Sequence, residues 1–449
     1  MGNQKVFEKF SSAAPFAVMT RVVTGVFISE ELDQVFEEHR EYQYSKTVKF
    51  SAISLAVADV AMNFSDNFNQ AYTTHREELG VAITSFYDKI KATETAVSEA
   101  VVARSAEVAS KLQDALGYVP WEVLPGYRVF GVDGNVLAKT DKRLGVLRES
   151  TGAPLPGKVV ARFDLQRQIF DRAYLLEDAH AQESTTGDRL VEDLLPNDVI
   201  VADRHYCIVR FLEKIATASG KFIIRQHGRL KGVLVGKRRC LGRTSSGVVY
   251  EQAMKLSASD DAMKVRRITV ELDQPTRDGE TEIHVLTNLP AKIKGTTIAD
   301  VYRLRWEEEN AFHVLQMTLT CELASVGHPR AALFLFCMSM LAYNLRQVIF
   351  AALYAEHPEE QVEQVSPFHV SIEVSRYTDG MLVALDDDDW QELMPNSIKG
   401  LVGVLREIAQ GIDFSKYKKS QRGPKKKKPK RSRNTKSSHV STARLLGLA

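Results

Sequence analysis

Three carboxylates occupy positions from which they could bind metal ions. Asp133 ends the first expected strand, Asp203 ends the fourth, and Glu309 lies on a helix expected over TTIADVYRLRWEEENAFHVLQMTL. Carboxylate oxygens are the ligands that Mg²⁺ prefers in proteins. Two such ions ~3.5–4 Å apart can stabilise the attacking and leaving oxygens of a phosphodiester, and they acidify a bound water. The three residues together therefore predict metal-assisted cleavage of a phosphodiester.

Each carboxylate also has a purely structural interpretation. Asp133 precedes a glycine and could be a turn residue. Asp203 precedes Arg204 and could form a surface ion pair. Glu309 ends an acidic run that would ordinarily be a solvated helix face. The joint arrangement is more specific than any single member.

The helix that carries Glu309 has two distinct faces. At ~100° per residue, five polar side chains fall within one arc of roughly 80°: Tyr302, Arg305, Glu309, His313 and Gln316. A separate apolar arc suits packing on a sheet and contains Leu304, Ala311, Leu315 and Leu319. Arg305 can bind a phosphate through two hydrogen bonds, and Tyr302 can stack or donate a hydrogen bond. The alternative for this helix is a structural salt-bridge network.

The order of expected elements indicates an α/β protein. Residues 1 to about 115 have helix-forming composition, and strand texture begins at Tyr127, with a hairpin turn expected at Asp133-Gly134. Three strands, a helix, a strand, a helix and a strand then follow, which fits a mixed sheet. Residues 229–288 are β-rich, and helices return afterwards to about residue 415. The apolar segment 332–356 is expected to be a core helix, because Asn344 and Arg346 interrupt it.

The basic residues are distributed unevenly. Twelve Lys or Arg and no acid lie between Lys416 and Lys436, so 47 basic residues remain against 57 acidic ones elsewhere. This basic tail, with Lys425, Lys426, Lys427 and Lys428 at its centre, points to a polyanionic partner; a disordered solubilising tail is the alternative. A second acid-free stretch is expected to contact DNA phosphates or to be a solvated basic surface; it contains Arg225, Arg229, Lys231, Lys237, Arg238, Arg239 and Arg243.

The remaining composition is that of an ordinary globular protein. The 449 residues are 44% hydrophobic and 26% charged, which supports two to four domains. The four cysteines are widely spaced and form no CxxC, so neither a zinc ribbon nor a disulfide framework is expected. We therefore expect a reducing, cytoplasmic setting and no membrane association.

The chain resembles the bacterial insertion-sequence transposases of the DDE type that carry a Y-R-E-K signature. YRLRWEEENAFHVLQ matches the first three signature residues at Tyr302, Arg305 and Glu309. FGVDGNVLAKTDKRL and DVIVADRHYC resemble the first and second aspartate segments of the family. The resemblance spans about residues 30 to 350. Gln316 stands where the family has its lysine, which should weaken DNA-end binding without removing the metal ligands.

The resemblance implies a fold and a domain order. It implies an RNase H-like mixed sheet flanked by helices, with a β-rich insertion. The expected divisions are 1–118, helical and binding DNA ends; 119–228, the first part of the catalytic core; 229–288, the insertion; 289–350, the second part of the core; 351–415, helical and dimerising; and 416–449, the basic disordered tail.

The resemblance also implies an activity. Asp133, Asp203 and Glu309 would be catalytic and would hold two Mg²⁺ ions, with Mn²⁺ as a substitute. The substrates would be double-stranded DNA, both inverted-repeat ends and target, bound by a homodimer in a bacterial nucleoid. Strand cleavage would be followed by a hairpin and strand transfer, with Tyr302 and Arg305 on the phosphates near a flipped base. The alternatives are a catalytically silent DNA-binding derivative and, less favoured, a plain RNase H-like nuclease.

Overall fold

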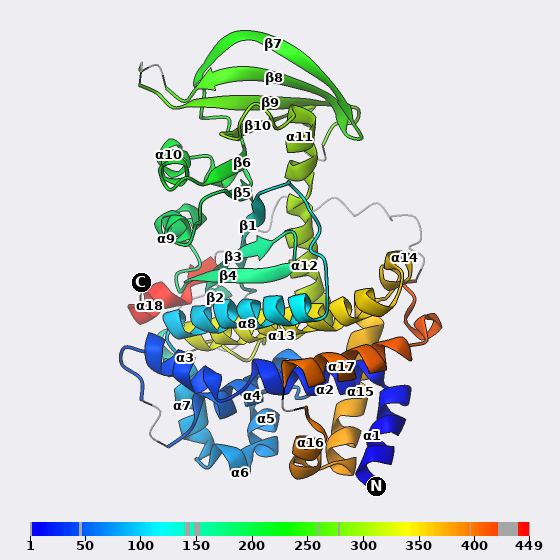
Figure 1. Cartoon of the computed structure of the whole chain (residues 1–449). Helices are drawn as coiled ribbons and strands as arrows, with labels where there is room; N and C mark the ends of the chain where they lie inside the picture. The colour runs from blue at the N-terminus through cyan, green and yellow to red at the C-terminus, as the bar shows by residue number, and fades with distance from the viewer. Residues whose placement is uncertain are drawn as a thin grey trace.

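The computed structural model describes most of the chain. The described residues are 2–44, 47–138, 140, 144–147, 153–257, 259, 261–276, 279–395, 397–420 and 439–448. Within them, a large sheet stands above a body of helices, and the long helix α13 (Pro329–Glu356) runs between the two (Figure 1). The basic run that includes Lys425 to Lys428 lies outside the described residues.

Nine strands between residues 128 and 287 form one sheet. Its order is β4-β3-β1-β5-β6-β10-β9-β8-β7. The strands are β1 (Arg128–Val136), β3 (Lys158–Asp164), β4 (Ile169–Leu176), β5 (Asp198–Ala202), β6 (Lys221–Arg225), β7 (Val233–Thr244), β8 (Gly247–Lys255), β9 (Lys264–Leu272) and β10 (Glu282–Thr287). Strands β1, β3 and β4 are antiparallel neighbours, whereas β1, β5 and β6 are parallel. This α/β arrangement is the RNase H-like sheet that the sequence predicts.

Short helices lie between the parallel strands. Helix α9 (Gly187–Glu192) precedes β5 and α10 (Val209–Thr217) connects β5 to β6, in the predicted order. Both contribute to a compact apolar cluster on one face of the sheet, where Leu190, Leu212 and Ile215 are buried with residues of the strands. Both faces must be covered because the central strands are buried, as in β5, all of whose residues are buried and all of which after Asp198 are apolar.

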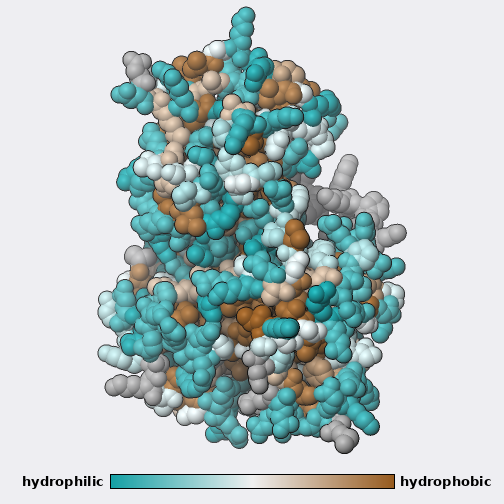
Figure 2. All heavy atoms as spheres, viewed as in Figure 1, coloured by the Kyte–Doolittle hydropathy of each residue, from teal (hydrophilic) through white to brown (hydrophobic). Residues whose placement is uncertain are grey.

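The β-rich segment 229–288 is part of the nine-stranded sheet and does not form a separate sheet. Strand β10 pairs with β6 on one side and with β9 on the other. Strand β7 forms the outer edge and is exposed along most of its length. In Figure 2 the surface near this outer end is mostly hydrophilic, whereas hydrophobic residues gather lower down, over the helical body.

The N-terminal and C-terminal helices share one hydrophobic core. That core includes buried residues from Ala14 to Tyr417. The N-terminal helices are α1 (Gly2–Ala13), α2 (Pro15–Phe27), α3 (Glu31–His39), α4 (Phe50–Ala61), α5 (Phe68–Thr74), α6 (Arg76–Leu79), α7 (Ile83–Ala92) and α8 (Thr95–Ala115). The C-terminal helices are α14 (Glu359–Val362), α15 (Pro367–Ala384), α16 (Asp387–Leu393) and α17 (Ile398–Gln410). The Glu373 carboxylate on α15 accepts the backbone N–H of Phe16 at 2.9 Å, which joins the two groups.

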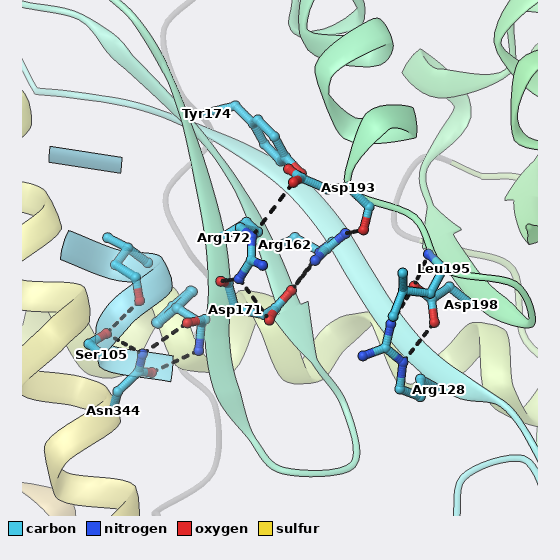
Figure 3. A network of polar contacts seen from close by, with 12 residues as sticks. Ser105, Arg128, Arg162, Asp171, Arg172, Tyr174, Asp193, Leu195, Asp198 and Asn344 are labelled. Carbon is cyan, nitrogen blue, oxygen red and sulfur yellow. Dashed lines mark hydrogen bonds and ion pairs between the residues drawn. The ribbon is translucent and has the colours of Figure 1, made fainter. Parts of the chain in front are cut away.

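Helix α13 is the central core helix, as its sequence predicts. It is long and apolar enough to cross a membrane, but 83% of its most apolar 18-residue window is buried within the protein. Asn344 is satisfied there: its amide binds both backbone groups of Phe170, at 2.8 and 2.9 Å, and the Ser105 hydroxyl at 2.8 Å (Figure 3). Because a buried amide without partners would be costly, these bonds explain how an apolar helix accommodates an asparagine.

An ion pair between a half-exposed arginine and a buried aspartate joins the first residues of two central strands. The Arg128 guanidinium donates to both carboxylate oxygens of Asp198 at 2.8 and 2.7 Å (Figure 3). Arg128 begins β1 and Asp198 begins β5, and the two are register partners. A two-bond contact of this kind holds its partners in one geometry, so it helps to align the far end of the β1–β5 pairing, where Asp133 follows Val132 and Asp203 follows Ala202.

Three local expectations are corrected by the structure. No hairpin turn forms at Asp133-Gly134, because β1 continues through both residues and pairs them with Ala161 and Val160 of β3. The helix expected over 296–319 is divided at Leu304 into α11 (Gly295–Arg303) and α12 (Arg305–Thr318). The sequence has no Pro or Gly at this point that would have predicted the break.

The third correction concerns the end of the basic tail. Residues expected to be disordered form β11 (His439–Ser441) and α18 (Thr442–Leu446). Strand β11 pairs in parallel with β2 (Ala153–Leu155), which lies between β1 and β3 in the sequence. Thr442 and Ala443 are fully buried, and Arg444 pairs with Asp178 at 2.5 Å. The C-terminal segment therefore packs against β2 and Asp178, which are remote from it in the sequence.

Candidate active site

Asp133 and Asp203 follow equivalent positions on two adjacent parallel strands. Val132 of β1 and Ala202 of β5 are register partners, and the two aspartates come next on their strands. Asp203 adds its charge to the factors that raise the pKa of Asp133, as expected of neighbouring carboxylates. The sheet thus brings together the first two predicted catalytic residues, which are 70 positions apart in the sequence.

Asp203 is held by the turn that follows it. Its carboxylate accepts the backbone N–H of His205 at 2.7 Å and thereby caps the short helix η3 (Arg204–Tyr206). Its other oxygen lies 2.9 Å from Nδ1 of His205. These contacts fix the side chain at the carboxyl edge of the sheet, where ligands of open α/β sheets bind.

Arg305 connects Asp133 to the third predicted carboxylate. Its guanidinium lies 3.4 Å from the Asp133 carboxylate and 2.6 Å from that of Glu309. Arg305 also forms a hydrogen bond with Tyr302, whose pKa is raised chiefly by burial. Tyr302, Arg305 and Glu309 therefore gather beside the aspartates even though the helix is divided between Tyr302 and Arg305.

Glu308 is a site residue that the sequence did not reveal. It is fully buried, and its Oε1 accepts the backbone N–H of Asp133 at 3.1 Å. Its Oε2 is buried without a hydrogen-bond partner. A Cβ on Gly131 would lie only 2.6 Å from that oxygen, so β1 needs a glycine there for Glu308 to pack against it. Because Glu308 stands within an acidic run, periodicity alone did not separate it from Glu307 and Glu309.

The site carries an excess of negative charge. Burial raises the pKa of Asp133 to about 6, against the opposing effect of Arg305, and Asp203 and Glu183 raise it further. Burial likewise raises the pKa of Glu308 well above its usual value, with Asp133 as the next cause. Glu183 approaches the strand so closely that a Cβ on Gly134 would collide with it. Like-charged carboxylates in one place favour either protonation or a bound cation.

The donor set fits a divalent cation in its chemistry. The residues supply hard carboxylate oxygens, including the unpartnered Oε2 of Glu308, in a charge-rich and partly buried place. In the part of the chain that the structure describes, however, no three His, Cys, Asp or Glu side chains are already grouped closely enough to hold a metal. Arg305 now lies between Asp133 and Glu309 as the neutralising charge.

Four of the seven basic residues between Arg225 and Arg243 that are expected to contact DNA pair with acidic residues elsewhere in the chain. Arg225 pairs with Glu280, Arg238 with Glu271 and Glu282, and Arg239 with Glu251. Arg238 also covers the ring of Tyr250 at 3.9 Å, so this tyrosine is not an open aromatic surface. Lys237 forms no ion pair among the described residues and lies on the exposed face of β7. These contacts leave the DNA-binding prediction untested.

Comparison with known proteins identifies the class. Residues 158–345 match the family model of the transposase DDE domain, a segment that holds Asp203 and Glu309 and begins after Asp133. The comparison with curated proteins gave no match. A cryo-EM structure of the piggyBac transposase synaptic complex with hairpin DNA is similar over 87% of this chain and 85% of that chain, at 10% identity and a TM-score of 0.43; this likeness adds no argument.

An RNase H-like sheet with carboxylates directly after the last paired residues of the parallel strands β1 and β5, together with the matched domain, defines an enzyme that acts on DNA strands. The chain therefore carries a transposase DDE domain over residues 158–345. Transposases of this class use divalent metal ions, in agreement with the oxygen-donor set of the site.

Proposed function

We propose that this transposase moves an insertion sequence by cutting and pasting DNA. The single observation that carries the proposal is the position of Asp133 beside Asp203, with Arg305 joining Asp133 to Glu309. Asp133, Asp203 and Glu309 are the residues that the Y-R-E-K resemblance assigns to catalysis, and Arg305 is one that it assigns to DNA phosphates. The bacterial nucleoid as the cellular location is part of the same proposal.

Asp133, Asp203 and Glu309 would hold two divalent cations, Mg²⁺ or Mn²⁺. Such ions would polarise the scissile phosphodiester and acidify the attacking water. The Arg305 side chain is only 12% exposed. Its guanidinium would exchange its contacts with the carboxylates for hydrogen bonds to a phosphate oxygen. The hydroxyl of the partly buried Tyr302 would orient the same guanidinium. Glu308 would keep α12 at a fixed distance from β1.

The later steps rest on the resemblance to Y-R-E-K transposases. The released 3′-hydroxyl would attack the opposite strand to give a hairpin and would then attack target DNA. The partners would be inverted-repeat ends and target DNA, bound by a homodimer.

A cleavage assay tests the proposal. The full chain would be incubated with Mg²⁺ and a duplex carrying the inverted repeats that flank its gene. Asp203→Asn should abolish cleavage and leave DNA binding intact. Asp188→Asn is the matched control, because Asp188 is an exposed acid on α9 that pairs with Lys214 away from the site. Cleavage that persists in Asp203→Asn would contradict the proposal.

A catalytically silent DNA-binding derivative is the second candidate. It is favoured by Gln316, which is exposed on α12 where the related enzymes have a lysine. Binding of the inverted repeats without cleavage, in Mg²⁺ and in Mn²⁺, would decide for this candidate.

A further inference from the structure

A cavity of about 680 Å³ opens beside the catalytic aspartates at the carboxyl ends of β5 and β6. Neither the sequence motifs nor the domain match assigns it a role. Its polar wall comes from four segments of the chain and contains Lys158, His180, Arg204, His205, His227 and Arg229.

The cavity adjoins the active site directly. Arg204 and His205 follow Asp203 in the chain and line the cavity, and Nδ1 of His205 is 2.9 Å from the Asp203 carboxylate. Glu183 also lines the cavity and packs against Gly134, the residue after Asp133. A strand of DNA held at the two aspartates would therefore have this cavity on one side of the scissile bond.

The charge of the lining favours an anion. Lys158, Arg204 and Arg229 contribute three cations, whereas Glu183 is the one acid in the lining. Lys158 lies 3.9 Å from Glu183, and Arg204 lies 3.5 Å from Glu280, which it shares with Arg225. The exposed Arg229 side chain forms no ion pair with any described residue. Arginine in such a position binds phosphate oxygens through two parallel hydrogen bonds.

The cavity also has an apolar part and is of suitable size. Cys207, Ile208, Val209 and Leu230 complete one wall. Sites for small organic ligands commonly enclose ~300–1,000 Å³ and combine apolar walls with a few polar groups. This lining matches the chemistry of a nucleotide, whose base and sugar are suited to an apolar wall and whose phosphate is suited to a basic rim.

We propose that this cavity binds one nucleotide of a DNA strand adjacent to the scissile phosphate, with Arg229 on the phosphate. The inference rests on the proposed function, because it requires a DNA strand at Asp203. The strand belongs either to the transposon end or to the target, and both present the same phosphate chemistry.

The test measures DNA binding by fluorescence anisotropy with the full chain in the absence of divalent ions, so that cleavage plays no part. One duplex carries the inverted repeat and the other a scrambled sequence. Arg229→Gln is compared with Arg229→Lys and with Arg210→Gln, the latter an exposed arginine on α10 outside the cavity. The double variant Arg204→Gln/Arg229→Gln removes both arginines of the rim. Thermal unfolding verifies that each variant is folded.

Arg229→Gln should weaken binding by roughly threefold to tenfold at moderate salt and lower the slope of log affinity against log salt by about one. Arg229→Lys should recover part of the affinity, and Arg210→Gln should match the wild type. A loss confined to the inverted-repeat duplex assigns the cavity to the transposon end, and a loss on both duplexes assigns it to DNA strands in general. Unchanged affinity and slope in both the single and the double variant would overturn the inference, even if the wild type cuts DNA.

Discussion

Glu308 and Asp133 are joined by a hydrogen bond from the Asp133 backbone N–H to the Glu308 carboxylate, at 3.1 Å. Glu308 is fully buried, whereas the next residue, Glu309, is one-third exposed and pairs with Arg305. Consecutive glutamates on α12 therefore have different roles: Glu308 anchors the helix to β1, and Glu309 faces the catalytic residues. This anchor sets the distance between Asp133 and Glu309.

Removing the Glu308 carboxyl should impair catalysis through Asp133. Glu308→Leu leaves the Asp133 N–H without its acceptor, at a cost of ~1–3 kcal/mol in the free energy of unfolding. We expect the cleavage rate to fall by roughly 10–100-fold, as for groups that support metal ligands, with DNA affinity unchanged. Glu308→Gln retains an acceptor and should recover most of the rate. Wild-type cleavage by Glu308→Leu, with Glu307→Gln as the control, would refute this role.

Arg305 should not tolerate lysine. Lysine cannot reproduce the planar contact that joins Asp133 to Glu309. Arg305→Lys is expected to lower the cleavage rate by about 10–100-fold, measured in single-turnover assays over a range of Mg²⁺ concentrations. Arg303→Lys, on the exposed side of α11, provides the control. Equal rates for the two variants would show that the bridge is only structural.

Gln316→Lys should strengthen DNA-end binding. The position is exposed on α12, on the side of the helix that carries Glu309. One new phosphate contact should raise the slope of log affinity against log salt by about 0.9. Binding titrations at four salt concentrations would measure this, with Gln316→Glu as the opposite change. An unaltered slope in both variants would mean that no phosphate lies near this position.

Arg238 should contribute to stability more than to DNA binding. Its guanidinium joins Glu271 of β9 to Glu282 of β10 and covers the Tyr250 ring. Arg238→Gln is expected to lower the free energy of unfolding by about 1 kcal/mol or less, since the group is 35% exposed and partly screened. Arg238→Gln should lower DNA affinity less than Lys237→Gln does. Lys237→Gln removes a cation that has no ion-pair partner among the described residues. A larger affinity loss in Arg238→Gln would restore it as a DNA contact.

His75 should make stability depend on pH. Burial lowers its pKa, but hydrogen bonds to Asp59 and Glu78 outweigh this effect and raise the pKa to about 9. A raised folded-state pKa gives stability that is complete below the unfolded-state pKa of ~6.5 and lost as pH rises through ~9. The amount is on the order of 3 kcal/mol. Urea unfolding from pH 6 to 10 should show the wild type losing its advantage over His75→Gln; a constant difference would contradict the assignment.

The sequence determined the elements and their order. Helices to residue 115, the strands and helices around β5, and the buried helix α13 all follow from local periodicity, because the spacing of apolar residues selects helix or strand. The acidic run at 386–389 is also a local signal, because Asp386 and Asp389 form the capping box at the start of α16. Asp203 at the end of an apolar strand was also predictable, since one segment contains both the strand and the residue.

Only the tertiary structure decided which side chains meet. The continuation of β1 through Asp133-Gly134 depends on pairing with β3, which overrides the local turn preference of that dipeptide. The ion pairs of Arg225, Arg238 and Arg239 depend on acids 12 to 55 residues away, so a stretch without acids in sequence is not without acids in space. Glu308 became distinct from its neighbours through contact with a strand 175 positions earlier. Hydrophobic periodicity records the direction in which a residue faces, but the identity of its partner is set by the packing of remote segments.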